Sequence, residues 1–178
     1  YLTRLSPALR DFERRTRKLE REQKARFERV EDEGVLEPVL AALHRLQEER
    51  WSAQGSAALA TYMGFLRRLA PLLAARGWLD VNVLWIEEAP VAIDLAFRLK
   101  GVYYGYAAAF DPDPRWKKYG VGILLLASSI RTAIEDGLRT FDLMRGEDAY
   151  KARFDTVTSR NHRFRLLKTR KRYWIYRI

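Results

Sequence analysis

The sequence of 178 residues is long enough for one domain with a hydrophobic core, and its 48% hydrophobic and 31% charged residues are typical of a globular protein. It has no cysteine and only two histidines, which excludes a disulfide framework and argues against zinc or Ser-His-Asp chemistry, so we expect no metal. The formal net charge of +10 favours an anionic partner. No apolar run approaches the roughly 18 residues of a membrane span, so we expect a cytoplasmic protein that does not cross a membrane.

The positive charge is concentrated at the two ends of the chain. Residues 1–30 hold 10 Lys or Arg against 5 Asp or Glu, and residues 160–178 hold 8 basic residues and no acidic one. A nucleotide, nucleic acid, a phosphorylated precursor or a membrane surface would fit this pattern, and so would a merely solvated face. The sequence begins with Tyr1 rather than Met, which favours a piece of a longer protein and leaves a missing N-terminal half or a homodimer open.

Residues 1–24 are predicted to form a basic helix ahead of the main domain, which we place at residues 25–178. Ser6 and Pro7 suit the N-cap and the first helical position. Apolar or small side chains then recur in steps of four and three, at Leu5, Leu9, Phe12, Thr16 and Leu19. A stripe this narrow predicts that the helix lies along a partner surface, which could belong to this domain, another chain or an absent segment.

The periodicity of the remaining chain changes between helical and extended. Predicted helices span residues 35–51, 59–77 and 121–136, and predicted strands span residues 26–30, 78–87, 91–100, 102–110, 140–144, 163–169 and 172–178. The three consecutive strands over residues 78–110 are joined by short turns, so we expect them to form an antiparallel meander.

A glycine-containing turn separates the strand over residues 102–110 from the following helix. It reads Lys117-Lys118-Tyr119-Gly120-Val121-Gly122, and the two glycines leave the first N–H groups of the helix unshielded. Such a helix start attracts phosphate. A tight turn that merely seats the helix is the alternative explanation.

Two motifs resemble known acyltransferases. The K-x-x-G-x-G turn resembles the pyrophosphate loop of the GNAT superfamily, usually Q/R-x-x-G-x-G/A, with Lys117 as a conservative departure. The segment FDLMRGEDAYKARF resembles the F-D-x-x-R-G-D-x-x-Y-K-x-x-[FW]-G segment of CelD/BcsL-like enzymes of cellulose biosynthesis, which are related to Fem-type peptidyltransferases. Glu147 and Asp155 depart from it, where Asp and Gly are usual.

This resemblance implies a GNAT-like fold of the mixed α/β class, with about seven strands and flanking helices, to which the N-terminal helix is an addition. It also implies that the fourth and fifth strands splay apart. The acyl donor, acetyl-CoA or another acyl-CoA, would lie in that gap with its phosphates on the glycine turn. The residues that we expect to contact the donor are Ala109, Phe110, Lys117, Lys118, Tyr119, Gly120, Val121 and Gly122.

Direct attack of an amine on the donor is the simplest mechanism, since no covalent nucleophile stands out. Asp111 ends the fourth strand and is a candidate base, with turn formation before Pro112 as the alternative. Asp142 faces away from its apolar neighbours on the fifth strand, and a buried carboxylate there would need Arg145 or Lys151 as a partner.

A second hypothesis concerns the segment after the fifth strand and adds Tyr150 to the candidate catalytic residues. Arg145 and Lys151 would hold an anionic substrate, with Tyr150 as proton donor, because the matching Y-K region of Fem-type enzymes lies at the transfer site. An internal salt bridge that fixes the turn remains the structural alternative for these charges.

Three functions follow from these observations. The first is an N-acyltransferase that acts on an amine of a sugar, polysaccharide or cell-envelope precursor. The second is a Fem-type transferase that takes aminoacyl-tRNA, which the basic ends favour. The third is a non-catalytic module that binds nucleic acid through residues 160–178, where basic and aromatic residues are interleaved.

Overall fold

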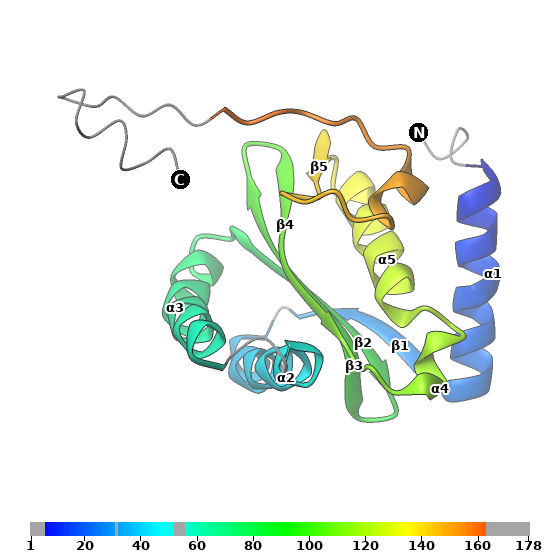
Figure 1. The fold of residues 1–178 in the computed structure, drawn as a ribbon, viewed down its shortest axis with the longest axis horizontal. Helices are drawn as coiled ribbons and strands as arrows, with labels where there is room; N and C mark the ends of the chain where they lie inside the picture. Colours follow the sequence, from blue (N-terminus) through cyan, green and yellow to red (C-terminus); the bar gives the residue numbers. More distant parts are fainter. Residues whose placement is uncertain (1–5, 31, 52–55, 163–178) are drawn as a thin grey trace, which may run out of the picture.

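The computed structural model describes residues 6–30, 32–51 and 56–162 (Figure 1). The helices are α1 (Ser6–Gln23), α2 (Glu33–Trp51), α3 (Ser56–Ala74), α4 (Pro114–Lys117) and α5 (Val121–Glu135), followed by a 3-10 turn, η1 (Lys151–Phe154). The strands are β1 (Ala25–Arg29), β2 (Leu79–Ile86), β3 (Ala89–Leu99), β4 (Val102–Phe110) and β5 (Thr140–Asp142). Within these ranges, no helix is long and apolar enough to cross a membrane.

The strands form one mixed sheet in the order β1-β2-β3-β4-β5. Strands β1 to β4 pair antiparallel to their neighbours, whereas β4 and β5 run parallel. The predicted meander and the mixed sheet are therefore confirmed. The two further strands predicted over residues 163–169 and 172–178 lie outside the described residues.

Two local predictions need correction. The fifth strand ends at Asp142 instead of residue 144, because Met144 adopts a positive φ of 58° that an extended strand does not allow. The segment after β4, where no helix was predicted, contains the short helix α4. Asp113 caps this helix by accepting a hydrogen bond from the backbone N–H of Arg115, and Pro114 is the first residue of the helix.

Helices cover both faces of the sheet (Figure 1). Helices α2 and α3 pack on one face and share a core with β2, β3 and β4, in which Leu40, Leu43 and Leu95 are buried. Helices α1 and α5 lie on the other face, where the core includes Leu84 of β2 and Leu124 of α5. The site described below lies at the end of β4 that is nearest to the start of α5.

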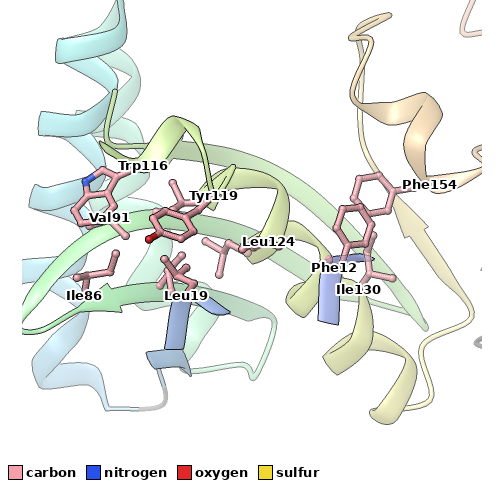
Figure 2. Packing of buried hydrophobic residues seen from close by; sticks show 14 residues of the cluster. Phe12, Leu19, Ile86, Val91, Trp116, Tyr119, Leu124, Ile130 and Phe154 are labelled. Carbon is pink, nitrogen blue, oxygen red and sulfur yellow. The ribbon is translucent and has the colours of Figure 1, made fainter. Parts of the chain in front are cut away.

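The N-terminal helix α1 packs on this domain. Phe12 and Leu19 are 5% and 0% exposed, which confirms the predicted stripe at these two positions. Phe12 stacks on Phe154 with ring centroids 5.5 Å apart, and Leu19 packs near Tyr119 (Figure 2). The side chains of Leu5 and Leu9 lie outside the described part of the structure. Of the partners left open by the sequence, the surface under α1 belongs to the chain itself.

A buried polar network lies under α5, near the middle of the sheet, where Asn82 of β2 pairs with Asp94 of β3 and Asp94 pairs with Ala108 of β4. The Tyr103 hydroxyl donates to the Asp94 carboxylate at 2.9 Å, and the Asn82 amide donates to Tyr103 at 3.1 Å and to Asp80 at 2.7 Å. Burial raises the pKa of Asp94 from 3.8 to about 6, and hydrogen bonding with the hydroxyl groups of Ser129 and Tyr103 lowers it only in part. The network therefore contains a carboxyl group whose pKa is raised to about 6 by burial.

Asp94 should make the stability of the fold decrease as the pH rises from about 4 to about 6. An acid with a raised folded-state pKa contributes stability that is complete below its unfolded pKa and is lost as the pH rises through the folded pKa. Asp94→Asn cannot ionise, so its melting temperature should lack this component. The measurement is the difference in melting temperature between wild type and variant from pH 4 to pH 7. Parallel profiles for the two proteins would contradict the assignment.

Candidate active site

Strands β4 and β5 are paired only at their beginnings. The three aligned pairs are Val102 with Thr140, Tyr103 with Phe141, and Tyr104 with Asp142. Strand β4 continues for six residues beyond this pairing, whereas β5 has ended. The parting of the fourth and fifth strands that the resemblance implied is thus present in the described residues.

A β-bulge bends β4 just where the two strands part. Leu95 of β3 faces Ala107 and Ala96 faces Gly105, so Tyr106 is the extra residue. Its ring packs against Phe97 at 4.5 Å between centroids, on the face covered by α2 and α3. A bulge increases the local bend and twist of a strand, which accounts for the departure of β4 from β5.

Beyond the bulge, the backbone N–H and C=O groups of β4 point alternately toward β3 and toward the open edge on the side of β5. The N–H of Asp111 donates to Val91 of β3 at 2.8 Å, so residues of the same parity, including Ala109, also direct their backbone groups to β3. Ala108 directs its backbone groups to the opposite edge, on the side of β5. Ala109 is 2% exposed, so a backbone contact with a donor is better placed at Ala108 than at the predicted Ala109.

The glycine turn begins α5 in a conformation that favours glycine. Gly120 is the N-cap residue, with φ 68° and ψ 52°. Its carbonyl accepts from Ile123 and Leu124, so the N–H groups of Val121 and Gly122 precede the first bond within the helix. A Cβ at Gly122 would lie only 2.8 Å from the ring of Phe110. The end of β4 therefore packs closely against the start of α5.

The predicted donor residues divide into a buried and an exposed group. The side chain of Tyr119 is buried and its hydroxyl donates to Glu22 of α1 at 2.9 Å, so Tyr119 anchors the turn in the core (Figure 2). Lys117 and Lys118 are exposed beside the turn, and the ammonium of Lys118 lies 4.7 Å from the centre of the Tyr119 ring. The two lysines are therefore accessible to an anion, whereas the Tyr119 side chain is not.

Asp111 uses both carboxylate oxygens to hold the loop after β4. One oxygen accepts from the backbone N–H of Asp113 at 2.8 Å, and the other accepts from the indole N–H of Trp116 at 3.1 Å. Trp116 is 6% exposed and belongs to the core under α1. These contacts favour the turn-forming role of Asp111 over the role of a base.

Lys151 is buried beneath the turn that follows β5. Its ammonium donates to the carbonyl groups of Met144, Arg145 and Gly146 at 3.3, 2.9 and 3.0 Å. It also forms an ion pair with Asp148 at 3.3 Å. A turn with positive φ at residues 144 and 146 aims these carbonyls inward, and the ammonium supplies the donors that they need.

The predicted pairing of Asp142 with Arg145 or Lys151 is wrong. Asp142 is exposed, and its carboxylate accepts from the backbone N–H of Met144 at 2.7 Å, so no buried charge requires a partner there. Arg145 is also exposed. Tyr150 packs at the edge of the core near Lys151, whose ammonium lies 6.0 Å from its ring centre.

Comparison with known proteins identifies the family. Residues 7–152 match the sequence profile described as "Acetyltransferase (GNAT) domain". The chain belongs to the GNAT acetyltransferase family. It is therefore an acetyltransferase-family enzyme, and the predicted fold class is confirmed. Comparison with curated protein sequences gives no match.

Solved structures share the fold of this GNAT enzyme at low sequence identity. A GCN5-related N-acetyltransferase from Ralstonia eutropha JMP134 has a TM-score of 0.60 and 17% identity, over 80% of this chain and 98% of that one. The aminoglycoside acetyltransferase meta-AAC0020 from an uncultured soil sample, in complex with sisomicin, has a TM-score of 0.55 and 19% identity, over 81% and 97%. AAC(6')-Iy in complex with the bisubstrate analog CoA-S-monomethyl-acetylneamine has a TM-score of 0.51 and 12% identity, over 80% and 98%.

Sequence reasoning missed the contribution of α1 to this site of the GNAT enzyme. The guanidinium of Arg15 donates to the carbonyl of Tyr119, the residue before the glycine turn. No local signal marks Arg15, because it is one of many basic residues on α1 and its partner is 104 residues away. Trp116 was missed as well, although the Asp113-Pro114 cap signal could have placed it on a short helix.

Replacing Lys151 with Met should destabilise the GNAT enzyme. The three carbonyl groups would lose their shared donor inside a largely buried site, at a cost of about 1–3 kcal/mol, which is several degrees in melting temperature for a chain of this size. The measurement is thermal unfolding of the ligand-free variant. Lys117→Met is the matched control, since Lys117 is exposed, and it should unfold within a degree or two of wild type. Equal melting temperatures for the two variants would remove this structural role from Lys151.

Proposed function

We propose that this enzyme transfers an acetyl or other acyl group from acyl-CoA to the amine of an amino sugar, or of a polysaccharide or cell-envelope precursor that contains one. The observation that carries the proposal is the glycine turn at the start of α5, which lies against the free end of β4 through Phe110 and Gly122. Support also comes from similar structures described with sisomicin and with a CoA bisubstrate analog.

The turn suits the phosphates of a CoA ester. The N–H groups of Val121 and Gly122 begin a 15-residue helix, whose N-terminus carries partial positive charge. Lys117 and Lys118 are exposed beside them. In the proposed pose the pantetheine arm runs from this turn along β4, where the backbone groups of Ala108 face the side of β5.

The proposed chemistry is direct transfer. The amine nitrogen of the acceptor attacks the thioester carbon, a C–N bond forms, the C–S bond breaks, and the thiolate takes up a proton. Tyr150 is our candidate for the proton donor. Asp142 is the candidate to accept the proton of the amine, because its exposed carboxylate ends β5 beside the parting strands, whereas Asp111 holds the loop after β4. Lys151 would act by ordering the turn that carries Arg145, which is the candidate contact for the acceptor.

Acetyl-CoA should raise the melting temperature of the wild-type protein. Ligand at about 100 times its dissociation constant adds about 2.7 kcal/mol of stability, which corresponds to roughly 5–11 °C for this chain length. The measurement is thermal unfolding with and without acetyl-CoA, with pantetheine as the control ligand that lacks the pyrophosphate. A shift with aminoacyl-tRNA and none with any CoA ester would favour the Fem-type alternative instead.

Gly120→Ala and Gly137→Ala form a matched pair for locating the donor. Both glycines have a positive φ, 68° and 72°, so both variants should lose about 1 kcal/mol or more of stability. A Cβ at Gly137 has nothing within 4 Å, whereas a Cβ at Gly120 would crowd Arg15 at the turn. Only Gly120→Ala should weaken the shift with acetyl-CoA. Equal shifts in the two variants would place the donor elsewhere.

The acceptor class can be tested through release of free CoA. The chain has no cysteine, so a thiol reagent detects the CoA product without a protein background. With acetyl-CoA as donor, turnover should appear with amino sugars such as glucosamine or sisomicin and be absent with the matching sugars that lack an amine. Turnover that is the same for both groups of sugars would reject the proposed acceptor.

A further inference from the structure

We propose that Arg15 of α1 is a donor-positioning residue that binds the pyrophosphate of the acyl donor at the Gly120 turn. This inference rests on the proposed function and assigns a role to a helix that precedes the sheet. Its basis is a guanidinium held at the glycine turn together with an unbalanced positive charge at the same place.

The geometry places Arg15 directly at the start of α5. One terminal nitrogen of its guanidinium donates to the carbonyl of Tyr119, and the same nitrogen lies 2.5 Å from the position of a Cβ on Gly120. The other terminal nitrogen is 3.6 Å from the carboxylate of Asp11. A guanidinium carries five N–H donors, so these contacts leave capacity for phosphate oxygens. The side chain is 23% exposed, which leaves it accessible from solvent.

The positive charge at the start of α5 is not balanced by nearby acidic residues, so an anion would be stabilised there. A helix N-terminus carries partial positive charge, so a cation there is unfavourable by itself. The first turn of α5 contains no acidic residue, and the exposed Lys117 and Lys118 add to the positive charge beside it. Asp11 offsets Arg15 only in part, because its other oxygen pairs with Arg14 at 2.7 Å. A pyrophosphate group would balance these charges, and the planar guanidinium matches its oxygens.

The competing explanation is that Arg15 only ties α1 to the carbonyl of Tyr119. Arg15→Gln separates the two roles, because the glutamine amide can still donate to a carbonyl but carries no charge. Arg14→Gln is the matched control, since Arg14 is the neighbouring residue on α1, pairs with the same Asp11 and is 76% exposed. Both variants remove one positive charge from the same helix.

The experiment is calorimetric titration of wild type and both variants with CoA and with 3'-dephospho-CoA, which share the pyrophosphate. Arg15→Gln should weaken both ligands by about 10- to 100-fold, the usual effect of losing a hydrogen bond between charged groups. Arg14→Gln should change either affinity by less than about 3-fold, because an exposed charge at a distance is screened. Circular dichroism and melting curves of the ligand-free variants establish that they are folded.

Three results would overturn the inference while leaving the proposed function in place. The first is an Arg15→Gln variant that binds both ligands with wild-type affinity. The second is an Arg15→Gln variant that loses affinity for CoA alone, which would indicate a contact with the 3'-phosphate. The third is a loss of affinity in Arg14→Gln equal to that in Arg15→Gln. Failure of the wild type to bind either ligand would instead reject the proposed donor, and the role of Arg15 with it. If Arg15→Gln does not fold, Arg15→Lys is the substitute variant. It should bind both ligands at least about 3-fold more weakly than wild type, since an ammonium cannot form the bidentate contact of a guanidinium. Wild-type affinity in that variant would overturn the inference.

Discussion

The side chain of Tyr119 joins the N-terminal helix to the turn from which α5 begins, and the position of the candidate site depends on this contact. Its ring is 3% exposed within the core, and its hydroxyl contacts Glu22 and Gln23 of α1. Its backbone carbonyl accepts from Arg15. Because one residue contacts α1 through both its side chain and its backbone, the glycine turn and α1 form a single packed unit.

The parting of β4 and β5 has causes on both strands. On β4, the extra residue Tyr106 is held by the ring of Phe97 on the far face of the sheet, so the bulge is fixed by packing. On β5, the strand ends at Asp142 and the chain reverses through a turn whose carbonyl groups surround the ammonium of Lys151. Neither strand could extend its pairing with the other without losing one of these arrangements.

Most of the fold could be predicted from the sequence, because its signals are local. The alternation of side chains and the flanking glycines placed β4 at residues 102–110, where the structure has it, and α5 within a residue or two of its observed ends. The glycine turn was also predictable, since a left-handed residue before an apolar helix favours glycine. The stripe of α1 predicted that this helix is packed, but an amphipathic pattern does not specify its partner.

The candidate site was less predictable because its contacts are distant in sequence or use backbone atoms. The motif that contains Lys151 drew attention to the correct segment, but its charge pattern suggested an ion pair with Asp142. The actual acceptors include three carbonyl groups, which every residue carries and no sequence pattern marks. Arg15 is a similar case, since it is one arginine among many on α1 and the turn that it contacts lies four strands and three helices further along the chain.

The docking of α1 also constrains how the chain can fold. Phe12 stacks on Phe154, which follows it by 142 residues, so the apolar stripe of α1 finds its full partner surface only when α5 and η1 are in place. Contacts between such distant residues carry a large loop-closure entropy and slow the search for the native state. During synthesis, α1 is made before the elements that cover it, so its apolar stripe is open to contact with other chains until α5 and η1 are in place.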